Sequence, residues 1–150
     1  MPKYARMTKL VAVGKMRDKF CEQQCSSFLT RAGAYGKCEV ITVPDSDVAG
    51  EGKAIIRELD KERNAIVVIL SEEGKEFTTA EFSAFLGRAD RKIVFVIGGP
   101  FGLAPEVKSR ASMLWSLSKL TFTHEMARFL FCEQLYRALN FLNGGAYHHI

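Results

Sequence analysis

The segment RKIVFVIGGPFG, residues 91–102, joins a short apolar run to a glycine-rich turn. An apolar run of about four to eight residues that ends at a turn signal is typical of a strand buried on both faces, as in a parallel sheet. Comparable runs occur at residues 10–13, 38–43 and 65–70. The segment therefore predicts one of several parallel strands, with a turn at the carboxyl end, where ligands of such sheets usually bind.

Amphipathic helical patterns separate these runs. Apolar residues recur at three- and four-residue spacing over residues 18–32 and 47–62. Residues 78–81, TTAE, have the spacing of a capping box and predict the start of a third helix. A short helix is expected after Pro105, and residues 123–142 form a long apolar helix. The order predicts an α/β fold with a mostly parallel sheet and helices on both faces.

The length and composition of the chain indicate a single domain. Its 150 residues, 47% of them hydrophobic, suffice for one well-buried core and are too few for two catalytic domains. The net charge of +4 and the pI near 8.9 favour a polyanionic partner only mildly, because 17 acidic residues are mixed with 21 basic ones. No apolar run reaches the roughly 20 residues needed to cross a bilayer, so no membrane-spanning role is expected.

The four cysteines indicate reduced thiols and a cytoplasmic location. They include no C-x-x-C pair, and no secretory signal precedes them. Cys21 and Cys25 stand four residues apart and could present two thiolates to a metal, but no nearby His or Cys completes a tetrahedral set. We therefore expect buried thiols and no metal site. Residues 1–6 are interpreted as a short extension or a misplaced start.

Two segments in the second half of the chain have features of a ligand-binding site. Gly98, Gly99 and Gly102 lack side chains, so backbone amides there can approach a ligand closely. Their spacing differs from the dinucleotide fingerprint, and Pro100 removes an amide donor, so a plain strand-to-helix turn is an equal alternative. The segment LSKLTF, residues 117–122, can hold an adenosyl group, although Ser and Thr before a helix are commonly caps.

Four segments taken together resemble a known family. They are IGGPFGL at 97–103, LSKLTFTH at 117–124, EQLYRA at 133–138 and YH at 147–148. This combination resembles the RlmH group of the SPOUT methyltransferases. The resemblance also includes VAVGK at 11–15 and GK at 74–75, and so covers essentially the whole chain. It is most specific over residues 93–148.

The resemblance implies a fold, an activity and partners. The implied fold is a SPOUT-type α/β fold whose carboxyl-terminal part forms a trefoil knot, a feature that no sequence pattern predicts because knots are nearly absent from proteins. The implied activity is methylation of N3 of a pseudouridine in a hairpin loop of large-subunit (23S) ribosomal RNA, with S-adenosyl-L-methionine as cofactor. The implied assembly is a homodimer. A chain this small offers little surface for reading RNA sequence, so we expect an assembled ribosome as the substrate.

The resemblance also implies site residues, position by position. The expected cofactor contacts are Leu70, Gly98, Gly99, Leu117, Ser118, Lys119, Leu120, Thr121, Phe122 and Thr123. The expected catalytic residues are Glu133, Arg137, Tyr147 and His148. This chain departs from the family at its end, where His149 and Ile150 follow the Tyr-His pair in place of the usual Arg or Lys. It also has Glu125 where the family often has Pro or Gln, a change that we expect to matter less.

The chemistry of methyl transfer suits these residue types. A sulfonium donor is already electrophilic, so the protein mainly aligns the reactants and needs no metal. The N3 proton of pseudouridine must leave before the nitrogen can attack, and His148 is a candidate base because imidazole accepts protons near neutrality. Arg137 is a candidate for stabilising the oxyanion that develops. Without the resemblance, Glu133 and Arg137 would be interpreted as an exposed i, i+4 pair, and the segment after the Gly144-Gly145 hinge as a frayed tail.

Two rival functions remain open from the sequence. One is a non-catalytic RNA-binding or ribosome-associated module on the same fold, which the basic charge and the altered tail favour. The other is a nucleotide-binding oxidoreductase, which only the glycine turn favours, since no acidic residue stands at a suitable distance to bind a ribose. The last helix is apolar most of the way round, so we expect a second copy of the chain to cover part of it.

Overall fold

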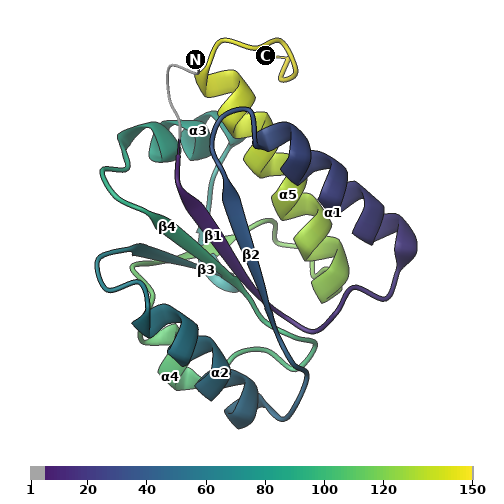
Figure 1. Cartoon of the computed structure of the whole chain (residues 1–150), viewed down its shortest axis with the longest axis vertical. Coiled ribbons are helices and arrows are strands. Elements are labelled where there is room, and N and C mark those ends of the chain that lie inside the picture. The colour runs from purple at the N-terminus through teal and green to yellow at the C-terminus, as the bar shows by residue number, and fades with distance from the viewer. Residues whose placement is uncertain (1–5, 150) are drawn as a thin grey trace.

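A computed structural model describes residues 6–149, in which strands and helices alternate (Figure 1). Most of the extension predicted at residues 1–6 and the terminal Ile150 therefore lie outside the described residues. In chain order the elements are β1 (Thr8–Val13), α1 (Lys19–Ala32), β2 (Cys38–Val43), α2 (Val48–Asp60), β3 (Ile66–Glu76), α3 (Thr79–Arg88), β4 (Ile93–Ile97), α4 (Pro105–Lys108), β5 (Met113–Ser116) and α5 (His124–Leu142).

The five strands form one sheet in the order β2-β1-β4-β3-β5, and every pairing between neighbours is parallel. Helices α1, α3 and α5 cover one face, and α2 and α4 cover the other (Figure 1). The predicted α/β fold with helices on both faces is confirmed. The carboxyl-terminal trefoil knot implied by the resemblance stays a prediction.

The sequence-based prediction missed strand β5 and ended β3 too early. Strand β5 has only four residues and lies at the edge of the sheet, so pairing with β3 is what holds it extended. Trp115 lies opposite Leu70 and again opposite Lys75, because residues 71–74 leave the ladder as a bulge. This bulge brings residues 71–73 to the carboxyl edge of the sheet.

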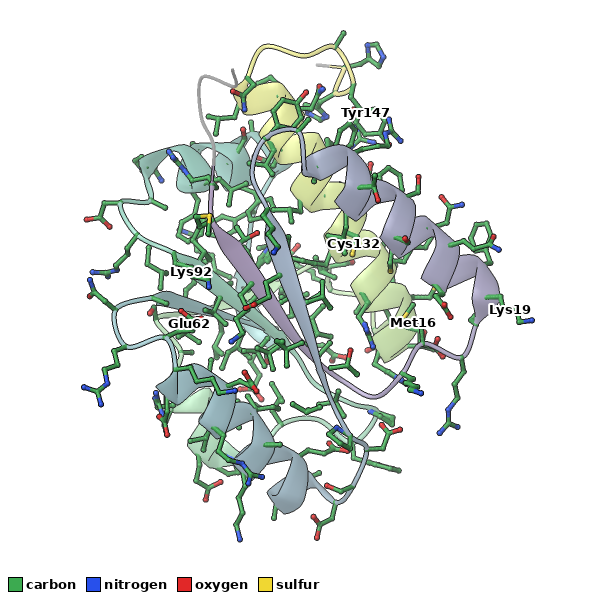
Figure 2. All side chains as sticks on the ribbon, viewed as in Figure 1. Met16, Lys19, Glu62, Lys92, Cys132 and Tyr147 are labelled. Atoms are coloured by element: carbon green, nitrogen blue, oxygen red, sulfur yellow. The ribbon has the colours of Figure 1, made fainter. Side chains whose placement is uncertain are left out.

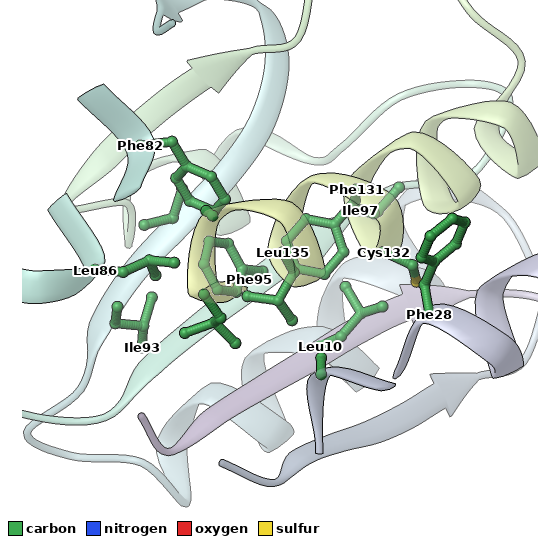
Figure 3. Packing of buried hydrophobic residues seen from close by; sticks show 14 of the residues in the cluster. Leu10, Phe28, Phe82, Leu86, Ile93, Phe95, Ile97, Phe131, Cys132 and Leu135 are labelled. Atoms are coloured by element: carbon green, nitrogen blue, oxygen red, sulfur yellow. The ribbon is translucent and has the colours of Figure 1, made fainter. Parts of the chain in front are cut away.

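Helix α5 lies in the centre of one face, between α1 and α3 (Figure 1). Its fully buried residues Phe131, Leu135 and Leu139 pack on the sheet, with the ring of Phe131 centred 4.7 Å from that of Phe95 (Figure 3). These three residues are therefore covered within the chain, whereas Met126 stays 38% exposed and Phe129, Leu130, Phe141 and Leu142 are only partly buried. Cover by a second copy of the chain stays a prediction. Among residues 6–149, no helix is both long enough and apolar enough to span a membrane.

We predict that Phe131→Ala destabilises the protein by about 3–5 kcal/mol, because it leaves a cavity between α5 and the sheet. Phe101→Ala is the matched control, since the Phe101 side chain is 84% exposed, and it is expected to change stability by less than about 0.5 kcal/mol. Urea unfolding at one protein concentration measures both. Equal effects of the two substitutions would contradict the central position of α5.

Candidate functional site

A cleft of about 1060 Å³ opens between the bulge of β3, the carboxyl ends of β4 and β5, and the start of α5. The glycine turn after Ile97 and the segment 117–122, which the sequence predicts as ligand-binding, both contribute to it. Of the residues expected to contact a cofactor, the cleft is lined by Leu70, Gly98, Gly99, Leu117, Ser118, Leu120, Thr121, Phe122 and Thr123. Lys119 is exposed and does not line it. The volume is at the upper end of the range typical for small-molecule sites.

The glycine turn after β4 forms one wall of the cleft. The amide of Gly102 donates to the carbonyl of Gly99 at 3.1 Å, and Gly102 has a positive φ of 85°. A Cβ at Gly99 would lie 3.2 Å from Val13 Cγ1 and 3.4 Å from Glu51 Oε1. Gly99 thus packs closely against its own chain, and its expected contact with a ligand stays a prediction.

The loop before α5 forms the opposite wall and is held by its own hydroxyl groups. The Ser116 hydroxyl donates to the carbonyl of Ser118 at 2.8 Å, and the Ser118 hydroxyl accepts from the amide of Leu120 at 3.0 Å. Thr123 caps α5 by accepting from the amide of Met126 at 3.2 Å. Capping and cleft formation are therefore both functions of this segment. The Leu120 side chain lines the cleft while remaining 70% exposed.

Carboxylates gather at the mouth of the cleft. Glu72 and Glu73 come from the bulge of β3, and Asp18 and Glu125 from the starts of α1 and α5. Lys108 and His124 also line it, and Lys108 forms an ion pair with Glu73 at 3.1 Å. The mouth is therefore acidic and suits a ligand with positive charge.

Glu125 has a larger role than the sequence suggested. Its Oε1 accepts from the amides of Arg17 at 2.7 Å and Asp18 at 2.9 Å, which ties the loop after β1 to the start of α5. These bonds, led by the one from Asp18, lower the pKa of Glu125 and keep it ionised. An acid in the first turn of a helix is an ordinary sequence feature, so nothing in the sequence revealed its partners more than 100 residues away.

A second cluster brings together all four residues expected to be catalytic. Oε1 of Glu133 accepts from Arg137 Nε at 2.8 Å and from the Tyr147 hydroxyl at 3.2 Å. Nη1 of Arg137 lies 3.2 Å from Nδ1 of His148. Because a guanidinium can only donate, Nδ1 accepts, and a neutral His148 carries its proton on Nε2. We call these four residues the tail cluster.

Interactions within the tail cluster fix the protonation states of Arg137 and Tyr147. The hydrogen bond from Arg137 to Glu133 raises the pKa of Arg137, so the guanidinium stays charged. Burial and the Glu133 carboxylate raise the pKa of Tyr147, so its hydroxyl stays protonated and donates. The pair that the sequence alone would place on the surface is thus half-buried and embedded in a hydrogen-bond network.

The carboxyl-terminal segment is docked rather than frayed. The buried Asn140 accepts from the amide of Tyr147 through its side chain at 3.1 Å and from the amide of Gly145 through its carbonyl at 2.8 Å. A Cβ at Gly145 would lie 2.3 Å from the Asn140 amide. The Tyr147 ring packs 4.9 Å from that of Tyr136, at the end of α5 beside α1 (Figure 2). The predicted hinge at Gly144-Gly145 is therefore a tight, packed turn.

The cleft lies at the start of α5, whereas the tail cluster takes Glu133 and Arg137 from its middle and second half. The cleft is lined by residues 123–127, whereas Glu133 and Arg137 stand nine and thirteen residues beyond His124. At a rise of 1.5 Å per residue, Ala127 and Glu133 are about 9 Å apart along the helix axis, and His124 and Arg137 about 20 Å apart.

The comparisons with known proteins agree with this architecture. The sequence matches the family model described as "Predicted SPOUT methyltransferase" over residues 7–148. It is 42% identical over 149 residues to the ribosomal RNA large subunit methyltransferase H of Gloeobacter violaceus, covering 94% of this chain and 97% of the relative. It is 40% identical over 158 residues to the protein of the same name from Maridesulfovibrio salexigens, covering 96% and 100%.

A solved structure supports the fold independently. The probable methylase family protein from Haemophilus influenzae superposes with a TM-score of 0.60 at 14% identity, covering 97% of this chain and 71% of that chain. The likeness in structure concerns the fold, and the likeness in sequence covers nearly every residue of both relatives. On these grounds the chain belongs to the SPOUT methyltransferase family.

Proposed function

We propose that the protein methylates N3 of a pseudouridine in a hairpin loop of large-subunit ribosomal RNA, with S-adenosyl-L-methionine as methyl donor. The names of its relatives support the RNA and the reaction. The observation that carries the proposal is the tail cluster, because a network of a guanidinium, an imidazole, a phenol and a carboxylate suits binding of a polar base. Ribosomes lie in the cytoplasm of bacteria, and we place the protein there.

The cleft fits the proposed cofactor in shape and charge. Leu117, Leu120 and Phe122 offer an apolar wall for an adenosine, and the acidic mouth suits the cationic sulfonium and amino groups. The buried indole N–H of Trp115, a residue that also lines the cleft, has no hydrogen-bond partner among residues 6–149. When bound, S-adenosyl-L-methionine supplies an electrophilic methyl group. The same acidic mouth repels a pyrophosphate, which argues against the oxidoreductase alternative.

The tail cluster suits the acceptor base of the reaction. Loss of the N3 proton leaves negative charge on the imide oxygens, which a fixed guanidinium at Arg137 stabilises. His148 has its Nδ1 lone pair directed to Arg137, so its Nε2–H is a donor. In the proposed mechanism the N3 proton passes to solvent water, and His148 donates its Nε2–H to an imide oxygen; its role as the base, inferred from the sequence, is the alternative. Glu133 and Tyr147 hold Arg137 in place.

We further propose a homodimer in which the tail cluster of one protomer completes the cleft of its partner. The separation of about 9–20 Å along α5 supports this arrangement, since methyl transfer requires the two reacting atoms in near contact. Two identical sites then form by twofold symmetry. The proposed substrate is an assembled ribosome, because a chain this small offers little surface for reading RNA sequence. The rival proposal is a non-catalytic module that binds the same RNA but does not transfer a methyl group.

The direct test is a methylation assay on ribosomes purified from a strain that lacks the gene. We expect incorporation of one methyl group into the large-subunit RNA, located by mass spectrometry at N3 of a pseudouridine. Tight binding to these ribosomes with no methyl transfer would favour the non-catalytic alternative.

We predict that Leu120→Lys weakens binding of S-adenosyl-L-methionine roughly tenfold, because it removes apolar cover worth about 1.5–3 kcal/mol when buried by a ligand. The fold should be kept, since the side chain is 70% exposed. Phe101→Lys is the control, as Phe101 is similarly exposed on the neighbouring loop and does not line the cleft. Isothermal titration measures both affinities. Equal affinities in the two variants would show that the cofactor binds at another site.

We predict that Arg137→Ala and Leu120→Lys complement each other when co-expressed. A homodimer of either variant alone methylates slowly when the cofactor is limiting. A mixed dimer contains one site with both defects and one intact site if the sites are shared between protomers. Random pairing then restores about a quarter of the wild-type methylation rate. A mixture no more active than the average of the two variants would show that each site is built within one chain.

A further inference from the structure

Arg31, in the last turn of α1, has an unusual environment for an exposed arginine. Its guanidinium carbon lies 4.3 Å from the ring centre of Tyr136, 5.1 Å from that of Tyr147 and 5.2 Å from that of Phe28. Three aromatic rings from α1, α5 and the docked carboxyl-terminal segment therefore hold one cation. Because Tyr147 belongs to the tail cluster, Arg31 lies directly beside that cluster.

The charge of Arg31 is not compensated by an acid. Within residues 6–149, no carboxylate lies within ion-pair distance of it, whereas Arg137 is paired with Glu133. Aromatic contacts do not use up the N–H donors of a guanidinium, which can still bind an acceptor. Arg31 is thus a fixed, charged set of donors, partly open to solvent, next to the residues proposed to bind the target base.

We infer that Arg31 binds a phosphodiester group of the RNA, adjacent to the nucleotide that the tail cluster holds. A planar fork of donors matches two phosphate oxygens, and aromatic packing lowers the entropy lost when the side chain binds. The single charge of the phosphate offsets the excess positive charge at this end of α5. The inference rests on the proposed function and adds a substrate contact outside the segments that resemble the family most specifically.

A purely structural role is the competing explanation, in which Arg31 only clamps the docked carboxyl-terminal segment. Arg31→Met distinguishes the two, because methionine keeps an apolar stem against the rings and removes the charge. Arg31→Lys keeps the charge and removes the planar fork. Arg63→Met is the matched control, since Arg63 is exposed and follows α2 on the opposite face of the sheet.

The experiment measures binding of each full-length variant to ribosomes from the gene-deleted strain over a series of KCl concentrations. We expect Arg31→Met to bind roughly tenfold more weakly at low salt, as for loss of a hydrogen bond to a charged group. The slope of log K against log salt should become shallower by about 0.7–1, the effect of one lost phosphate contact. Arg31→Lys should keep the wild-type slope with intermediate affinity. Arg63→Met should match the wild type.

Melting temperature and affinity for S-adenosyl-L-methionine are measured on the same samples and are expected to be unchanged in Arg31→Met. Wild-type affinity and slope in Arg31→Met would overturn the inference. A lowered melting temperature with an unchanged slope would also overturn it and assign Arg31 to the structural role. If the wild-type protein neither binds nor methylates these ribosomes, the proposed function fails, a result that differs from failure of Arg31 alone.

Discussion

Burial of α5 between α1, α3 and the sheet is the constraint on which the rest of the structure depends. Phe131, Leu135 and Leu139 fix this helix in position and rotation, because close-packed side chains do not slide past one another. Its first turn closes the cleft, and its second half presents Glu133 and Arg137. One rigid helix therefore sets the distance between the two halves of the proposed site.

The two halves of the site have opposite electrostatic character. The cleft has carboxylates at its mouth, which suits a cationic methyl donor. The tail cluster and Arg31 carry positive charge that Glu133 neutralises only in part, which suits an anionic RNA. A net charge of only +4 over the whole chain conceals this division.

Order at the end of the chain depends on polar and aromatic contacts together. Asn140 satisfies the backbone of the last turn, and Tyr147 fills the space between Phe28 and Tyr136. A buried amide that makes several hydrogen bonds specifies one conformation more strictly than apolar contacts do. The tail cluster is thus already formed in the folded chain before RNA binds. Part of the entropic cost of ordering the site therefore falls on folding and not on RNA binding.

The sequence by itself determined the order of helices and strands, since periodicity and caps such as Thr78 and Thr123 depend on residues a few positions apart. Its motifs also indicated the cleft residues and the tail cluster, although not how far apart they lie. Only the tertiary structure decided the strand β5, the bulge at 71–74, the contacts of Glu125 and the setting of Arg31. Each of these depends on partners distant in sequence, and a local pattern holds no information on which distant residues packing will bring into contact.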